Sequence, residues 1–188
     1  MSFHKLIFRF LLILILLFIV FSGCQSITQI RNQSQWAKQL PEEAVLKIES
    51  AIPAKAVVRP EKPKKLLIFN MHIWNGEIKK GHPSIPYANY AIELMGKMTG
   101  AYDVVFSSDT MMFHPDKIKE FDAICFNNTV GVLCEDPVLR YGLLDFIYEG
   151  GGFIGIHAAG ATFVQYPVYD QFPEFGVMLG GYENGGHP

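Results

Sequence analysis

The chain has no excess of basic charge and very little cysteine. Its 188 residues include 16 lysines and arginines against 18 aspartates and glutamates, a formal net charge of −2. A nucleic-acid-binding surface needs a clustered positive field, so we predict no nucleic-acid partner. With three cysteines and no Cys-x-x-Cys pair or Cys/His cluster, a zinc knuckle is excluded. The chain also lacks internal repeats and low-complexity tracts.

The one long hydrophobic run lies near the N-terminus. Residues 6–21 are almost unbroken Leu, Ile, Phe and Val, with basic residues at and near the start. This is the length of a signal peptide and short for a membrane-spanning helix. The run closes with Phe21-Ser22-Gly23-Cys24, which resembles the bacterial lipobox, whose cysteine is lipidated and becomes the mature N-terminus. The alternative is an uncleaved signal anchor with an incidental cysteine.

These features predict a membrane-anchored lipoprotein of the cell envelope, on the periplasmic or outer-membrane side. We expect a signal peptide over residues 1–23, a lipid such as palmitate on Cys24, and a polar, proline-punctuated tether over 24–63. Several acyl chains hold a protein firmly on a membrane, whereas a single chain binds reversibly. Residues 41–48 predict one short helix within the tether, because acidic residues occupy its first turn.

From residue 64 the pattern becomes an alternation of strands and helices, which we assign to one domain over 64–188. Continuous apolar runs predict four buried strands, over residues 65–70, 102–106, 122–126 and 153–156. Ser84 reads as the N-cap of the first intervening helix and Gly100 as its end. Asp136-Pro137 begins the last helix. This alternation predicts an α/β fold, a parallel sheet with helices on both faces.

The strongest functional signal is the segment Gly-Gly-Gly-Phe-Ile-Gly-Ile-His-Ala-Ala-Gly over residues 150–160. The glycines end a helix, a short apolar strand follows, and the chain then turns on small residues with His157 at the corner. Ligands of open α/β sheets lie outside the carboxyl ends of the strands. A tight turn there is where such folds present a reactive side chain. His157 is therefore the first candidate for catalysis; alternatively, it only hydrogen-bonds the backbone of the turn.

Several motifs together resemble the ThuA-like, or trehalose-utilisation, family. They are Gly81-His82-Pro83-Ser84-Ile85, Phe126-Asn127-Asn128-Thr129, the segment 150–159, Tyr166-Pro167-Val168-Tyr169, Leu179-Gly180-Gly181-Tyr182 and Gly186-His187-Pro188. The resemblance implies a flavodoxin-like fold of the class I glutamine amidotransferase-like type and a carbohydrate-related role. Family members continue beyond the position of Pro188, so we expect the domain to be truncated at the C-terminus.

Glutaminase chemistry is not expected, because the residue at the decisive corner is wrong for it. Amidotransferases carry a nucleophilic cysteine at the turn where this chain has His157. Attack on an amide needs a thiolate at that position, and Cys125 and Cys134 belong to an earlier strand and loop. These two cysteines form a disulfide in the envelope, or Cys125 is a buried strand residue with a free thiol.

Loops that follow parallel strands converge, so we expect one pocket lined by the polar residues of these motifs. His82 and His157 are the predicted catalytic residues, acting as general acid and base. Together with His187 they are also the candidate ligands of a divalent metal such as zinc, although none of the histidines shows i, i+4 spacing. The predicted groups for binding a sugar or oxidised sugar derivative are Asn128, Thr129, Tyr166, Tyr169 and His187.

Other interpretations stay open at several of these positions. His82 can brace its loop, and His72 and His114 read as ordinary loop and helix-start residues. After His157 the chain reads Ala159-Gly160-Ala161-Thr162, where relatives often carry a carboxylate that orients a histidine or shares in proton transfer. Three function classes therefore remain: a carbohydrate-processing enzyme, a non-catalytic sugar-binding lipoprotein, and a degenerate member without a ligand.

Overall fold

The structure is a computed structural model that describes residues 26–62, 64–165 and 171–183. The predicted signal peptide, the lipidation site Cys24 and three predicted binding residues (Tyr166, Tyr169 and His187) lie outside the described residues. Within the described residues, no helix combines the length and the hydrophobicity needed to cross a membrane.

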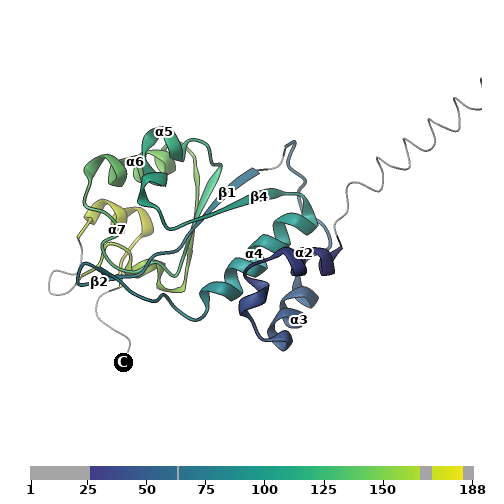
Figure 1. Ribbon diagram of the computed structural model, residues 1–188. Helices are drawn as coiled ribbons and strands as arrows, with labels where there is room; N and C mark the ends of the chain where they lie inside the picture. Colours follow the sequence, from purple (N-terminus) through teal and green to yellow (C-terminus); the bar gives the residue numbers. More distant parts are fainter. Residues whose placement is uncertain (1–25, 63, 166–170, 184–188) are drawn as a thin grey trace, which may run out of the picture.

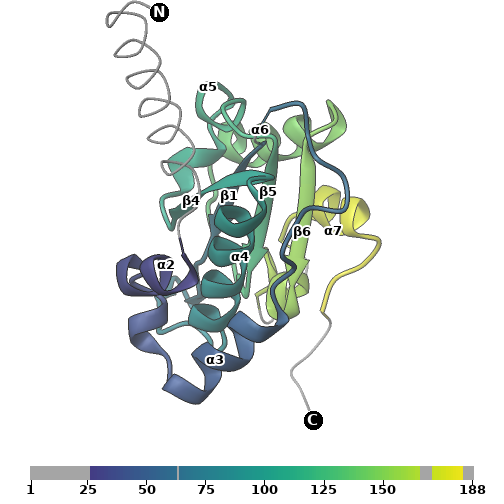
Figure 2. The ribbon, with the colours of Figure 1, turned by 90° about the vertical axis from the view of Figure 1, so that its right-hand side faces the viewer.

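Four parallel strands form the central sheet. They are β1 (Lys64–Phe69), β4 (Tyr102–Ser107), β5 (Ala123–Asn127) and β6 (Gly152–Ile156). The strands lie in the order β4-β1-β5-β6 (Figure 2), so the first strand of this sheet is flanked by the second and third strands of the sheet in chain order. Figure 1 shows the neighbouring strands β1 and β4 from another side. This is the strand order of the flavodoxin-like arrangement. The predicted α/β fold is confirmed.

Helices cover both faces of the sheet, because alternate strand residues point to opposite sides. Leu66 and Ile68 of β1 pack with Ile92 of α4 (Ile85–Thr99) on one face. Leu67 and Phe69 face the other side, where Leu139 and Leu143 of α6 (Pro137–Tyr148) pack. The remaining helices on that side are α5 (Pro115–Ile118) and α7 (Pro173–Leu179). The short turns η2 (Thr110–Phe113) and η3 (His157–Ala161) and the hairpin of β2 (Ile73–Trp74) and β3 (Glu77–Ile78) complete this part of the chain.

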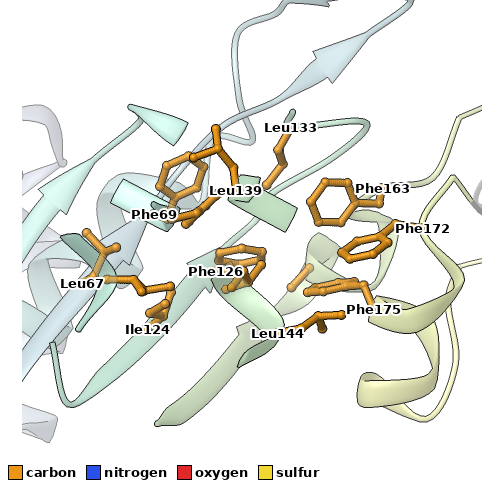
Figure 3. Close-up of a cluster of buried hydrophobic side chains, with 14 of the residues drawn as sticks. Leu67, Phe69, Ile124, Phe126, Leu133, Leu139, Leu144, Phe163, Phe172 and Phe175 are labelled. Carbon is orange, nitrogen blue, oxygen red and sulfur yellow. The ribbon is translucent and has the colours of Figure 1, made fainter. Parts of the chain in front are cut away.

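The core on the α6 face is built from interlocking phenylalanines (Figure 3). Phe126 of β5 lies at its centre, fully buried, with ring centroids 5.1–5.9 Å from those of Phe69, Phe113, Phe153 and Phe175. Two of these pairs are tilted, one is edge to face and one is stacked, and aromatic pairs at such distances add to the stabilisation from burial alone. The buried phenylalanines therefore support the carboxyl ends of the strands from the α6 face.

The helix boundaries predicted at Ser84, Gly100 and Asp136 are confirmed. Gly100 ends α4 in the left-handed conformation, with φ of 64°. Asp136 caps α6 by accepting a hydrogen bond from the Val138 N–H at 2.8 Å. Ser84 is the N-cap residue of α4 as predicted, but its side chain makes no capping hydrogen bond; the hydroxyl donates to Asn128 Oδ1 at 3.2 Å.

The segment we expected to be a tether is largely folded. Residues 26–51, here called the N-terminal helices, form α2 (Ile27–Gln33), η1 (Ala37–Gln39) and α3 (Glu42–Ala51), and the short helix expected over 41–48 lies within α3. They pack beside α4 (Figure 2). Ile30 and Val45 are buried against Tyr90 and Leu94 of α4. The segment is polar in composition, yet its few apolar residues fall on one side and cover α4.

Polar contacts add to this packing. Arg31 pairs with Glu49, its Nε donating to Oε1 at 2.6 Å, and the Tyr90 hydroxyl donates to the same oxygen at 2.7 Å. The hydrogen bond from Arg31 lowers the pKa of Glu49, whereas burial raises that of Tyr90. The N-terminal helices are therefore fixed to α4 rather than extended.

Candidate functional site

Three loops meet at the carboxyl edge of the sheet and are joined by backbone hydrogen bonds. The loop after β1 meets the loop after β5, where the Ile73 N–H donates to the Val130 carbonyl at 2.9 Å. The loop after β5 meets the segment after β6, where Gly131 N–H donates to Ala161 at 2.9 Å. These bonds fix the relative positions of the side chains that the loops carry.

Gly131 is the residue that permits this close approach. Its φ is +80°, and a Cβ at this position would lie 2.0 Å from the Ile73 carbonyl oxygen. Only glycine combines that backbone conformation with that proximity. Gly131 therefore brings the loop after β1, which carries His72, against the end of β5.

Three imidazoles lie in a row at this edge, here called the histidine row. The rings of His82 and His157 meet edge to face, with centroids 5.1 Å apart and an interplanar angle of 83°. The ring of His72 stacks with that of His82, with centroids 5.8 Å apart and an interplanar angle of 16°. The structure therefore brings together the two residues predicted to be catalytic, which come from the loop before α4 and the end of β6.

His72 is the member of the row that sequence reasoning missed. The sequence places it in a loop, and nothing in the local pattern distinguishes it from His114. The available signal was position: His72 lies shortly after the carboxyl end of β1, the same edge to which His157 was assigned. The backbone of His72 pairs with that of Val130 in an isolated parallel bridge, which fixes this loop against the segment after β5.

The environment of His72 favours the uncharged form of its imidazole. Burial, reinforced by His82, lowers the pKa of His72. The Nδ1 atoms of His72 and His82 are both buried, and neither has a hydrogen-bond partner among the described residues. A neutral imidazole can accept a proton or bind a metal through an unprotonated nitrogen.

Within the described residues, no group of three or more His, Cys, Asp and Glu side chains has an arrangement that could hold a metal ion. The third predicted ligand, His187, lies outside those residues. The metal therefore stays a prediction.

His157 occupies the strand-to-helix corner as predicted, in a backbone conformation that is uncommon for its residue type. Its φ is 51°, in the left-handed region, and β6 ends at the residue before it. Such strain is concentrated at functional sites, where surrounding structure maintains it. The side chain of His157 is exposed at this corner.

A cavity of about 450 Å³ lies beside His157, here called the His157 cavity. It is bounded by small residues that include Gly155 and Gly160, by Phe153 and Leu179, and by Tyr182. The volume falls within the roughly 300–1,000 Å³ of small-molecule sites. The cavity therefore offers apolar and aromatic surface next to an imidazole.

Asn128 and Thr129, predicted to bind substrate, are buried and bonded within the protein. Asn128 Nδ2 donates to Asn127 Oδ1 at 2.6 Å, and Asn127 Nδ2 donates to Asn89 Oδ1 at 2.8 Å. Asn89 in turn donates to Asn70 Oδ1 at 3.1 Å. These four residues, the asparagine network, join β1, β5 and α4.

The Thr129 hydroxyl lies 2.6 Å from that of Thr162, and both side chains are buried. Asn128 and Thr129 thus stabilise the carboxyl edge of the sheet through buried hydrogen bonds. Their contact with a substrate stays a prediction.

The two cysteines of the described chain lie away from the corner of β6 and are free thiols. Burial raises the pKa of Cys125 to about 12 and that of Cys134 to about 11. Neither thiol is therefore activated for nucleophilic attack, because the thiolate is the reactive form.

Comparison with known proteins adds a family match to this geometry. The model of the ThuA family, described as trehalose utilisation, matches residues 70–188. Among solved structures, the chain is similar to a ThuA-like protein from Bacteroides uniformis ATCC 8492, at 18% sequence identity and a TM-score of 0.49. The similarity covers 66% of this chain and 47% of that one, so the present chain matches about half of its length. No curated protein matches the chain.

Proposed function

Because this chain belongs to the ThuA family, we propose that it is an exported lipoprotein that binds or processes a sugar derivative at the histidine row and the His157 cavity. The observation that carries this proposal is the contact of the His82 and His157 rings, 5.1 Å apart, at the carboxyl edge of a parallel sheet. Ligands of open α/β sheets bind at this edge. The family's description, trehalose utilisation, supplies the class of ligand.

The chemistry available at the row is proton transfer. His157 is exposed beside the cavity, and a neutral imidazole there can take a proton from a sugar hydroxyl. The ring of His82 meets the ring of His157 edge to face and helps to hold it beside the cavity. Tyr182 offers an aromatic face and a hydroxyl to a sugar ring in the cavity.

Glutaminase activity is not part of the proposal. The corner after β6 carries His157, and the thiols of Cys125 and Cys134 have raised pKa values because they are buried. The fold is compatible with many chemistries, and only the residues of the site decide among them.

One observation favours a second candidate function, a sugar-binding module without catalysis. Catalytic histidines are commonly oriented by a hydrogen bond to a carboxylate. The Nδ1 atoms of His72 and His82 have no such partner among the described residues. The run Ala159-Gly160-Ala161-Thr162 also contains no carboxylate. Saturable sugar binding without any product would favour this candidate.

The proposal is tested with the full chain, kept in a detergent whose headgroup is not a sugar. Binding of trehalose and other disaccharides is measured by calorimetry, and product by chromatography. We expect His82→Ala and His157→Ala each to weaken binding about tenfold, corresponding to about 1.4 kcal/mol, and to abolish any turnover. His114→Ala is the control, because His114 lies at the start of α5 and outside the row.

Elemental mass spectrometry of the same proteins determines whether a metal is bound and which one. Near-stoichiometric zinc that is lost in folded His157→Ala would assign the row a metal. The proposal is wrong if both histidine variants fold and retain binding and turnover.

Export and anchoring have a separate test. In bacterial cells fed labelled palmitate, the native chain should incorporate the label and sediment with membranes. Cys24→Ser should remove the label, whereas Cys134→Ser should leave it unchanged. Label that persists in Cys24→Ser would contradict the proposed lipidation site.

A further inference from the structure

We infer that the N-terminal helices complete a second saccharide-binding site, at the carboxyl ends of β1 and β4. It shares with the proposed function the class of ligand, but none of the residues of the histidine row. The site is a cavity of about 510 Å³, here called the Trp36 cavity. Its aromatic lining comes from Trp36 and Phe106, and its polar lining from Gln35, Asn70, Ser107, Ser108 and Asp109.

The aromatic wall of this cavity is held in place before any ligand arrives. The Trp36 ring packs on Phe106 of β4, with centroids 5.0 Å apart and an interplanar angle of 57°. The Ser34 hydroxyl, two residues earlier, donates to Glu93 of α4 at 2.5 Å. Together with the Arg31–Glu49 pair, these contacts fix the wall to the domain. A preorganised wall loses little freedom on binding.

The opposite wall is the end of the sheet itself. Asn70 directly follows β1, while Ser108 and Asp109 directly follow β4. The Ser107 hydroxyl accepts a hydrogen bond from the Asp109 N–H at 3.0 Å, and Asp109 Oδ1 accepts one from Met111 N–H at 2.9 Å. The cavity therefore lies at the edge where ligands of such sheets bind, next to Asn70 of the asparagine network.

The wall formed by Gln35 and Trp36 comes from outside the part of the chain that matches the family model, which begins at residue 70. The Trp36 cavity is thus built jointly by the family domain and by the N-terminal helices. The His157 cavity, in contrast, lies entirely within the matched region.

The lining selects an uncharged, hydroxyl-rich ligand. Among the described residues, Asp109 is the only charged one that lines the cavity, so phosphates and carboxylates meet repulsion without a compensating cation there. Amides and serine hydroxyls donate and accept hydrogen bonds, and a carboxylate is a strong acceptor for sugar hydroxyls. An indole supplies the flat apolar surface on which the C–H face of a sugar ring packs.

The chain contains its own reporter for this site. Its two tryptophans are Trp36 and Trp74, so Trp74→Phe leaves Trp36 as the only indole. The full-length Trp74→Phe chain, in a detergent without a sugar headgroup, is titrated with trehalose, with maltose and with trehalose 6-phosphate. We expect a saturable change in Trp36 emission with the neutral disaccharides and none with the phosphate.

Two variants test the polar contacts without removing the aromatic wall. Gln35→Ala changes an exposed side chain, and Asp109→Asn keeps the oxygen that accepts from Met111. In the Trp74→Phe background, each should weaken the fluorescence-detected affinity about five- to tenfold, corresponding to about 1–1.4 kcal/mol. Asp145→Asn, an exposed carboxylate on α6, is the matched control and should change nothing.

The outcomes separate this inference from the proposed function. A Trp36 response that persists in His82→Ala and His157→Ala but weakens in Asp109→Asn supports a second site. Calorimetric sugar binding with silent Trp36 emission, unaffected by Asp109→Asn, overturns the second site and leaves the proposed function standing. A response to the phosphate alone overturns the ligand class. Absence of both calorimetric and fluorescence signals overturns both proposals.

Discussion

Two neighbouring strands, β5 and β6, are each followed directly by a non-glycine residue in the left-handed conformation, and the two residues have different roles. Asn128 follows β5 with φ of 60°, and His157 follows β6 with φ of 51°. Asn128 is buried and hydrogen-bonded to Asn127 and Ser84. His157 is exposed beside a cavity. The same backbone conformation therefore supports packing at one corner and presents an imidazole at the other.

The energetics of the two corners should differ accordingly. The left-handed conformation costs an L-residue about 1–2 kcal/mol, less for asparagine. At Asn128 the side-chain hydrogen bonds offset that cost. At His157 the same conformation places an exposed side chain beside the cavity proposed to bind the ligand.

The largest expected effect is at the buried corner. Asn128→Ala should lower the free energy of unfolding by about 3 kcal/mol, because it leaves buried polar groups unpaired and keeps the backbone in the left-handed region without the hydrogen bonds that offset its cost. Chemical denaturation measures this loss. Asn75→Ala is the control, since Asn75 has φ of 51° but is exposed; it should cost about 1 kcal/mol. Equal losses in the two variants would show that backbone strain alone decides the outcome.

Asn128→Gly sharpens the comparison by removing the strain and keeping the loss of hydrogen bonds. We expect a loss of about 1–2 kcal/mol, smaller than that of Asn128→Ala, because glycine adopts the left-handed conformation without a steric penalty. The same denaturation experiment measures it. A larger loss than in Asn128→Ala would contradict the assigned role of the backbone.

At the exposed corner, His157→Gly should change the free energy of unfolding by no more than about 0.5 kcal/mol, because the relief of backbone strain offsets the contacts that an exposed side chain loses. Sugar binding, measured by calorimetry on the same sample, should fall about tenfold. A stability loss as large as that of Asn128→Gly would assign His157 a structural role instead.

The smallest effect is a pH dependence. The pKa of His72 is lowered by burial, so the unfolded chain binds more protons than the folded one between the lowered pKa and about 6.5. The stabilisation is complete above that range and is lost as the pH falls through it. His72→Gln should flatten the stability profile between about pH 7 and 5, measured by denaturation at each pH. An unchanged slope would place the titration elsewhere.

The sequence predicted the sheet well, because continuous apolar runs leave little choice of structure. The strand expected over 102–106 is β4 (Tyr102–Ser107), and that expected over 153–156 is β6 (Gly152–Ile156). The corner at His157 followed from its neighbours, since a short apolar strand and small residues define it locally.

What the sequence did not reveal depends on contacts between distant segments. His72 joins the histidine row only because Gly131 allows two loops to approach. The Ser84 hydroxyl does not cap α4 but donates a hydrogen bond to Asn128, which lies 44 residues away. The N-terminal helices look polar and linker-like by composition, and only the surface of α4 shows what their few apolar residues cover.

The position of the first helix of the described residues, close to the proposed lipidation site, would determine how the domain is oriented at a membrane. Helix α2 is capped at Ser26, two residues after the proposed lipidation site. Two residues span at most about 7 Å. A lipid on Cys24 would therefore hold the domain against the lipid headgroups, with a linker too short for the domain to move far from the membrane. A protein mounted in this way would sample only the thin layer of solvent next to the bilayer, and its orientation there would be set by the N-terminal helices.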